Sequence, residues 1–147
     1  MRKQLWWLSV GSLLTLGLDS AAKFFATKYL ENPVEIFPFL RLQLSHNLNI
    51  AFGIPFPQVA TILLSFAAIL LFLYIYTQQT DKSPLATIAF ALLIGGALGN
   101  LGERIVFGQV TDFITLWFIP NFNIADTALT FGIVLLLLGY RKIFPAG

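Results

Sequence analysis

The stretch that decides the fold is QVATILLSFAAILLFLYIY, residues 58–76, which contains no charged residue. An α-helix needs about 20 mostly apolar residues to cross the hydrocarbon core of a bilayer. This stretch is therefore predicted to form a membrane span.

Three other segments meet the same criterion, at residues 4–22, 85–102 and 124–140. The composition agrees, because 57% of the chain is hydrophobic and 11% is charged, whereas soluble domains carry about 25% charged residues. The mean hydropathy is +0.80. We expect an all-α membrane protein of four transmembrane helices, forming a single integral membrane domain over residues 1–147, with no internal repeat.

The beginning of the chain allows a second interpretation. MRKQLWWLSVGSLL, residues 1–14, has the basic start and apolar continuation of a signal peptide, and a small-residue site follows in DSAAK, residues 19–23. We expect the segment to stay as the first span, because its apolar stretch is long and three more spans follow.

The orientation is predicted from lysine and arginine residues near the span ends, which favour the cytoplasmic side. Placing both termini in the cytoplasm puts five positive residues inside and four outside, and three of the outer four lie near an acidic residue. The two longer connections, residues 27–57 and 104–123, then lie outside. Within the first of them FLRLQLS, residues 39–45, alternates between apolar and polar residues and predicts a strand with one apolar face. The second is rich in aromatic residues, which suit the membrane interface.

Several classes of function are excluded by the composition. The chain has no cysteine and a single histidine, His46, so thiolate sites, a cysteine nucleophile and a histidine metal cluster are excluded. We expect no cofactor and no metal, and His46 is expected to be a solvated or interfacial residue. The net charge is +2 without a basic cluster, so nucleic acid is not an expected partner.

The polar residues within or beside the apolar segments converge on the predicted outer side. They are Asp19, Lys23, Asn47, Asn49, Asn100, Glu103, Arg104, Asp112, Asn123 and Asp126. Ionisable residues in or near spans are costly and usually functional. Structural roles remain open for several of them: Asp19 and Lys23 have the spacing of an ion pair within one helix, and Asp126 could cap the first turn of the last helix. Asp112 could be an ordinary loop acid.

Two aspartates that meet in a water-poor pocket can hydrolyse a peptide bond. Neighbouring carboxylates share a proton, so one can activate water while the other donates to the scissile carbonyl. Asp112 and Asp126 are the candidates, although their spacing does not show that they meet. The residues alone leave open an aspartyl peptidase, a small proton-coupled carrier and a non-catalytic membrane assembly subunit.

Four blocks of the sequence resemble the bacterial lipoprotein signal peptidases, also called type II or prolipoprotein signal peptidases. The blocks are LDSAAK (18–23), HNLNIAFGI (46–54), GGALGNLGERIVFGQVTDFITL (95–116) and PNFNIADTALTFG (120–132). The resemblance implies an intramembrane aspartyl endopeptidase of the bacterial cytoplasmic (inner) membrane, with its active site near the extracytoplasmic face. It would remove signal peptides from diacylglyceryl-modified prolipoproteins by cutting before the lipidated cysteine.

The same resemblance assigns roles to individual residues. Asp112 and Asp126 match the catalytic aspartates, and the supporting, substrate-binding positions are Asp19, Lys23, Asn47, Asn100, Glu103, Arg104 and Asn123. It also implies a small β-rich cradle from the first extracytoplasmic loop, contact with membrane lipids, and inhibition by cyclic peptide antibiotics such as globomycin. One chain supplies every site residue, so we expect a monomer. The sequence departs from the family pattern at Ala22, Asn49 and Glu103, which bears on substrate and inhibitor fit.

Overall fold

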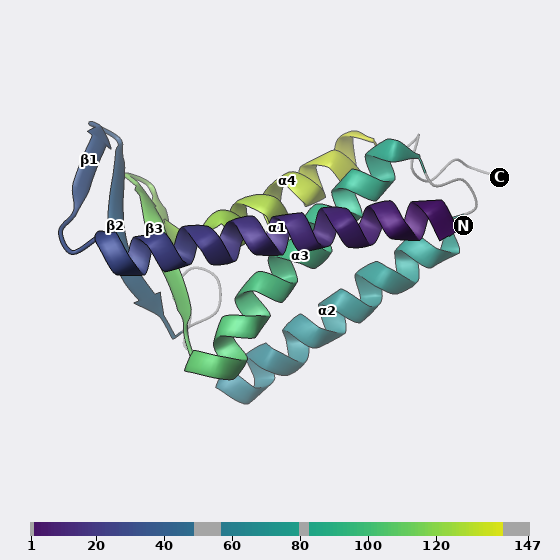
Figure 1. The fold of residues 1–147 in the computed structure, drawn as a ribbon, viewed down its shortest axis with the longest axis horizontal. Helices are drawn as coiled ribbons and strands as arrows, with labels where there is room; N and C mark the ends of the chain where they lie inside the picture. The colour runs from purple at the N-terminus through teal and green to yellow at the C-terminus, as the bar shows by residue number, and fades with distance from the viewer. Residues whose placement is uncertain (1, 49–56, 80–82, 140–147) are drawn as a thin grey trace.

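The structure is a computed structural model and describes residues 2–48, 57–79 and 83–139. It is mostly helical, with one small antiparallel sheet at one end of the helices (Figure 1). The helices are α1 (Arg2–Tyr29), α2 (Gln58–Gln78), α3 (Pro84–Phe107) and α4 (Ile124–Leu138). The strands are β1 (Val34–Phe37), β2 (Leu40–Asn47), β3 (Val110–Leu116) and β4 (Ile119–Phe122). Asn49 and the last predicted span residue, Tyr140, lie outside the described residues.

Each predicted span coincides with one helix, but α1 and α3 are longer than predicted. α1 continues to Tyr29, seven residues beyond the predicted end at residue 22, and α3 continues to Phe107. In the described part of the chain, α2 and α3 are long and apolar enough to cross a membrane, and α4 is a shorter apolar helix. α2 leaves most of its apolar side chains exposed. An apolar surface of this extent is unfavourable in water and suits lipid.

α3 is the central helix, and its small residues allow the others to approach closely. A Cβ atom added at Gly95 would lie 2.6 Å from the backbone oxygen of Ser12 on α1. One added at Gly96 would lie 2.6 Å from the backbone oxygen of Ala125 on α4. Small residues at such crossings are typical of membrane helices, which associate by close packing. The GGALG segment, residues 95–99, therefore serves close helix packing.

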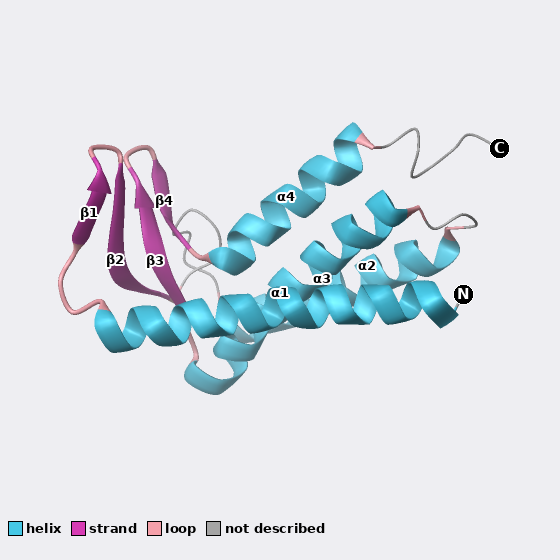
Figure 2. Ribbon diagram, turned by 45° about the horizontal axis from the view of Figure 1, so that its top comes forward, coloured by secondary structure: helices cyan, strands magenta, loops and turns pink. Residues whose placement is uncertain are grey.

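The sheet is built from both longer connections, in the order β1-β2-β3-β4 (Figure 2). The strand predicted at residues 39–45 is β2, and β1 and β2 form the small β-structure expected from the first longer connection. The sequence did not predict β3 and β4, which extend this sheet from the second connection. β2 pairs with β3, with Ser45 opposite Asp112. The first four residues of β3 are all buried, so its sequence lacks the polar alternation that reveals a half-exposed strand.

Helix ends explain how the chain reaches the site from α3. Ser83 caps the start of α3, where its hydroxyl oxygen accepts a hydrogen bond from the Ala86 backbone N–H, and Pro84 follows in the first turn. The helix ends at Gly108, whose φ of 73° is left-handed and is tolerated best by glycine. The chain then reverses into β3 and delivers Asp112 to the sheet beside the helix ends.

Candidate active site

The candidate site lies where the sheet meets α1, α3 and α4, and Lys23 of α1 is at its centre. The ammonium nitrogen of Lys23 lies 2.8 Å from Asp19 Oδ2 and 3.0 Å from Glu103 Oε2. It also donates a hydrogen bond of 2.9 Å to Asn100 Oδ1. An ammonium group has three donors, so this set of acceptors matches its capacity. Lys23 is only 4% exposed and connects α1 to α3.

Asp19 connects α1 to the beginning of α4. Its Oδ1 accepts a hydrogen bond of 2.8 Å from the Ala125 backbone N–H, while its Oδ2 faces Lys23. Backbone N–H groups in the first turn of a helix have no partner within the helix, and an acid is favourable there. The i,i+4 ion pair that the sequence left open for Asp19 and Lys23 is present, and α4 is the additional partner.

Gly99 makes room for this carboxylate, and its replacement by alanine is expected to destabilise the protein. An added Cβ would lie 2.5 Å from Asp19 Oδ2, so this oxygen, which pairs with Lys23, could not keep its position. We expect a loss of about 1–3 kcal/mol in the free energy of unfolding, the usual cost of overpacking a buried site. The measurement is denaturant unfolding in detergent micelles.

Gly102→Ala on the same helix is the matched control, because nothing lies within 4 Å of a Cβ added there. Alanine is favoured over glycine in helices by about 1 kcal/mol, so this variant is expected to be at least as stable as the parent. Equal stability of the two variants would contradict the packing role of Gly99.

Glu103 attaches strand β3 to α3. Its carboxylate oxygens accept two hydrogen bonds from Thr111, each of 2.8 Å, one from the backbone N–H and one from the hydroxyl. Glu103 also pairs with Lys23. This carboxylate therefore fixes the position of the residue directly before Asp112.

The side chains of Asn100 and Asn123 lie between the two candidate aspartates. Asn123 Nδ2 donates to Asp112 Oδ1 at 2.8 Å and to Asn100 Oδ1 at 3.1 Å. Asn100 Nδ2 in turn donates to Asp126 Oδ1 at 2.8 Å. A continuous chain of side-chain hydrogen bonds therefore joins Asp112 to Asp126.

Asn123 and Asp126 also form the first turn of α4. The side chain of Asn123 accepts from the Asp126 backbone N–H at 2.9 Å, and Asp126 Oδ2 accepts from the Asn123 backbone N–H at 3.3 Å. This reciprocal arrangement is a capping box, so the structural role considered for Asp126 is present. It leaves Asp126 Oδ1 directed to Asn100, and capping and a role in the site are compatible.

Asp112 and Asp126 line the same cavity, which has a volume of about 760 Å³. Its polar wall includes Asn47, Asn100 and Arg104, and its apolar wall includes Phe72 of α2 and Leu129 and Phe131 of α4. Asn47 Nδ2 donates to Asp112 Oδ2 at 3.1 Å, so β2 also contributes to the site. A cavity of this size and mixed lining is typical of a binding site for an organic ligand.

Comparison with known proteins identifies the family. A model of the family described as signal peptidase (SPase) II matches residues 12–141. The chain belongs to the signal peptidase II family. The lipoprotein signal peptidase of Aquifex aeolicus (strain VF5) is 37% identical over 99% of this chain and 92% of its own length. That of Coxiella burnetii (strain Dugway 5J108-111) is 35% identical over 95% of this chain and 90% of its own.

The fold is shared with a solved bacterial membrane enzyme. That structure has a TM-score of 0.84 and 25% sequence identity, and the match covers 92% of this chain and 87% of the other. Signal peptidase II is a protease family, so the chain is a membrane protease. In the described part of the chain, the cluster around Lys23, Asp112 and Asp126 is the candidate site for this protease activity.

The structure brings together nearly all residues that the sequence selected. Asp19, Lys23, Asn47, Asn100, Glu103, Asp112, Asn123 and Asp126 form one hydrogen-bonded and ion-paired cluster. Arg104 differs, because it lines the cavity but makes no ion pair with a described residue. Thr111 was missed by sequence reasoning. A threonine beside an aspartate has no distinguishing signal until its partner, Glu103, is known.

The surroundings of Asp112 favour its protonated form. Burial, with the nearby Asp126 carboxylate, raises the pKa of Asp112 from 3.8 to about 6, while hydrogen bonds from Asn47 and Asn123 oppose the change. The side chain is 1% exposed, so loss of hydration is the expected leading cause. A carboxyl group with this pKa can hold or release a proton near neutral pH.

The pKa of Asp112 predicts how stability depends on pH. Because the folded value of about 6 lies above 3.8, the contribution to stability is fully present below about pH 4. It is lost as the pH rises through about 6. Asp112→Asn removes this term, so the stability of the variant relative to the parent is expected to rise by up to about 3 kcal/mol between pH 4 and pH 7. Unfolding titrations in detergent across this range check it, and parallel pH profiles for variant and parent would contradict it.

Proposed function

We propose that this chain is an aspartyl endopeptidase that acts within the membrane on diacylglyceryl-modified prolipoproteins. It removes the signal peptide by cutting directly before the lipidated cysteine. Asp112 and Asp126 activate water, and Asp19, Lys23, Asn47, Asn100, Glu103, Arg104 and Asn123 hold the pocket or the substrate. The observation that carries the proposal is that both aspartates line one cavity and are joined through Asn100 and Asn123.

The charge balance of the cluster supports a shared proton. Within residues 2–48, 57–79 and 83–139, the four carboxyl groups of the cluster face two cations, Lys23 and Arg104, and Lys23 is already engaged by Asp19 and Glu103. Ionising both Asp112 and Asp126 would leave two neighbouring negative charges in a buried pocket, which is unfavourable. The pair therefore works with one proton between its members.

That single proton is sufficient for hydrolysis. The ionised carboxylate takes a proton from water as the water attacks the scissile carbonyl carbon. The protonated carboxyl donates its proton to the carbonyl oxygen, which gives a tetrahedral intermediate. Collapse of that intermediate breaks the C–N bond, with a proton delivered to the leaving amine. The asparagines fix both carboxyl groups before substrate arrives, which favours catalysis by preorganisation.

The walls of the cavity suit a membrane-embedded substrate. Its apolar side is formed by α2 and α4, including Ala68, Phe72 and Leu129. The apolar segment of a signal peptide can pack there while the peptide bond reaches the aspartates. The acyl chains of the modified cysteine remain in the lipid.

We infer four membrane spans, one for each helix, with both termini in the cytoplasm and the sheet on the outer face of the bacterial cytoplasmic membrane. The domain is a single unit over residues 1–147, with spans near 4–22, 58–76, 85–102 and 124–140. One chain supplies all site residues, so a monomer is sufficient, and cyclic peptides such as globomycin are expected to compete with substrate.

A proton-coupled carrier is less well supported. Such a protein needs acids near the midplane with access from both sides. The acids in the described helices, Asp19, Glu103 and Asp126, all belong to the cluster beside the sheet. A non-catalytic assembly subunit would not need a cavity lined by two carboxyl groups.

The test is cleavage of a purified diacylglyceryl prolipoprotein by the purified protein in detergent, with the products identified by mass spectrometry. We expect one cut, directly before the lipidated cysteine, and much slower cleavage of the same precursor without the diacylglyceryl group. Failure of the folded protein to cut the lipidated precursor would overturn the proposal and favour the carrier or the assembly subunit.

A further inference from the structure

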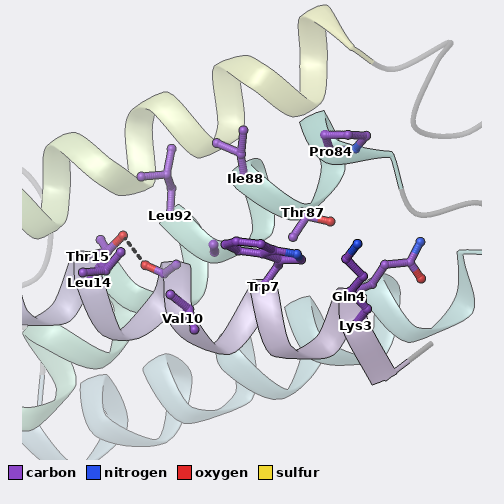
Figure 3. Close-up of a pocket in the computed structure, with 12 residues that line it drawn as sticks. Lys3, Gln4, Trp7, Val10, Leu14, Thr15, Pro84, Thr87, Ile88 and Leu92 are labelled. Carbon is purple, nitrogen blue, oxygen red and sulfur yellow. Dashed lines mark hydrogen bonds between the residues drawn. The ribbon is translucent and has the colours of Figure 1, made fainter.

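A second cavity lies between α1 and α3, in the half of the helices away from the sheet, and has a volume of about 710 Å³. Figure 3 shows the Trp7 ring between the two helices, with Lys3 and Gln4 toward one end and Leu14 and Thr15 toward the other. Asp112 and Asp126 do not line it. We call it the Trp7 groove, defined by Lys3, Gln4, Trp7, Leu14, Thr15, Thr87, Ile88 and Leu92.

Beyond the end at Lys3 and Gln4, the Trp7 groove is lined mainly by apolar groups. The hydroxyl groups of its two threonines form hydrogen bonds with other parts of the protein. Thr15 Oγ1 donates to the backbone oxygen of Gly11 at 2.9 Å. Thr87 Oγ1 lies 3.0 Å from the Tyr76 hydroxyl and donates to the Ser83 backbone oxygen at 3.2 Å. Both hydroxyl groups therefore already have partners within the protein, and a hydrocarbon is the matching occupant.

One end of the groove is polar and charged. Lys3 lines this end and is exposed, and the amide of Gln4 lies beside it. The groove extends along α1 from Lys3 to Thr15, a rise of about 18 Å. Half of the hydrocarbon core of a bilayer is about 15 Å thick, so the groove matches one leaflet, with its cation at the headgroup level.

We propose that the Trp7 groove binds an anionic phospholipid, with an acyl chain along Trp7 and Leu14 and the phosphate beside Lys3. The groove is charged at one end and apolar along the rest, as a phospholipid has a charged headgroup and apolar acyl chains. The proposed topology puts it in the cytoplasmic leaflet, which carries anionic lipids that attract basic residues near the surface. An apolar partner helix would match the tail region but would leave the position of Lys3 without a function.

The walls of the groove are formed by helices that also carry the site. Gly11 and Ala91 meet at its deep side, where a Cβ added at Gly11 would lie 2.8 Å from the Ala91 Cβ. Farther along, α1 carries Asp19 and Lys23, and α3 carries Asn100 and Glu103. A lipid in the groove fills the space between the two helices on the side where they are not in direct contact.

Fluorescence of Trp7 gives a direct test with the full-length protein. Trp6→Phe and Trp117→Phe leave Trp7 as the single tryptophan, since the chain has three. The protein is placed in vesicles of phosphatidylcholine with a minor fraction of phosphatidylglycerol. In one set the phosphatidylglycerol carries brominated acyl chains. In the other set an equal amount of phosphatidylcholine is brominated instead, so both sets have the same overall charge.

We expect brominated phosphatidylglycerol to quench Trp7 with about fivefold higher apparent affinity than brominated phosphatidylcholine, as one lysine near an anionic headgroup provides. Lys3→Gln is expected to remove this preference. Arg2→Gln is the matched control, because Arg2 is the adjacent exposed cation but does not line the groove, and it is expected to keep most of the preference.

Three results would overturn the proposal. The first is equal quenching of Trp7 by the two brominated lipids. The second is an equal loss of preference in Lys3→Gln and Arg2→Gln, which indicates general attraction to the surface. The third is protection of Trp7 from both lipids that increases with protein concentration, which indicates a second copy in the groove. Cleavage in detergent is expected to be unchanged by Lys3→Gln, so this test and that of the peptidase activity can fail independently.

Discussion

Asp112→Asn and Asp126→Asn are each expected to lower cleavage of a lipidated prolipoprotein by about 100- to 10,000-fold, the usual contribution of a general acid or base. Asparagine preserves the shape of each side chain but can neither take a proton from water nor donate an acidic one. Both members are needed, so the double variant is expected to be little worse than either single variant. The measurement is kcat/KM in detergent, with products identified by mass.

The structure supplies the controls for this experiment. Glu35→Gln removes an exposed acid on β1, outside the cluster, and is expected to leave cleavage unchanged. Folding of each aspartate variant is checked by its unfolding transition, because Asp112 and Asp126 accept hydrogen bonds from Asn47, Asn100 and Asn123. Full activity in a folded Asp112 or Asp126 variant would contradict the dyad.

The Asp112 variant is informative for a second reason. It is expected to be inactive. Its stability relative to the parent is nevertheless expected to be higher above about pH 6 than below about pH 4, because the parent holds a buried charge at the higher pH. A variant that is inactive because it has unfolded would instead be less stable than the parent. A variant that is inactive, folded and relatively more stable at higher pH therefore separates a catalytic role from a structural one.

The helices could be predicted from the sequence because a helix suited to lipid must have a long, nearly continuous run of apolar residues. A segment such as residues 58–76 must be apolar over its length, and no tertiary contact is needed to recognise it. The ends were less predictable. α1 continues past the apolar stretch through Lys28, because polar residues such as lysine are good helix formers and do not end a helix.

The sequence could indicate which residues belong to the candidate site, but not how those residues contact one another. Asp112 and Asp126 are conspicuous because acids are rare in this chain, but the bridge through Asn123 depends on β3 lying against the start of α4. In that placement the Glu103 carboxylate accepts two hydrogen bonds from Thr111. The strand itself escaped prediction because its buried residues do not alternate in polarity. Contacts between distant segments leave no periodic signal in either partner.

Lys23→Met is expected to have the largest effect on stability, a loss of about 3–5 kcal/mol in the free energy of unfolding. Breaking a buried ion pair by removing one partner leaves an uncompensated charge, and costs of this size are usual. Here the change leaves Asp19, which is fully buried, and Glu103 without their cation. It also removes the hydrogen bond to Asn100. Denaturant titration in detergent micelles measures the loss.

Two further variants distinguish uncompensated charge from lost packing. Lys28→Met removes a lysine of the same helix that is exposed and only lies over aromatic rings, so a loss of about 1 kcal/mol or less is expected. Combining Lys23→Met with Asp19→Asn and Glu103→Gln removes the orphaned charges while keeping acceptors for the Ala125 and Thr111 N–H groups. This triple variant is expected to recover part of the lost stability. If it is less stable than Lys23→Met alone, the carboxylates stabilise the fold without their cation, and the ion-pair explanation is wrong.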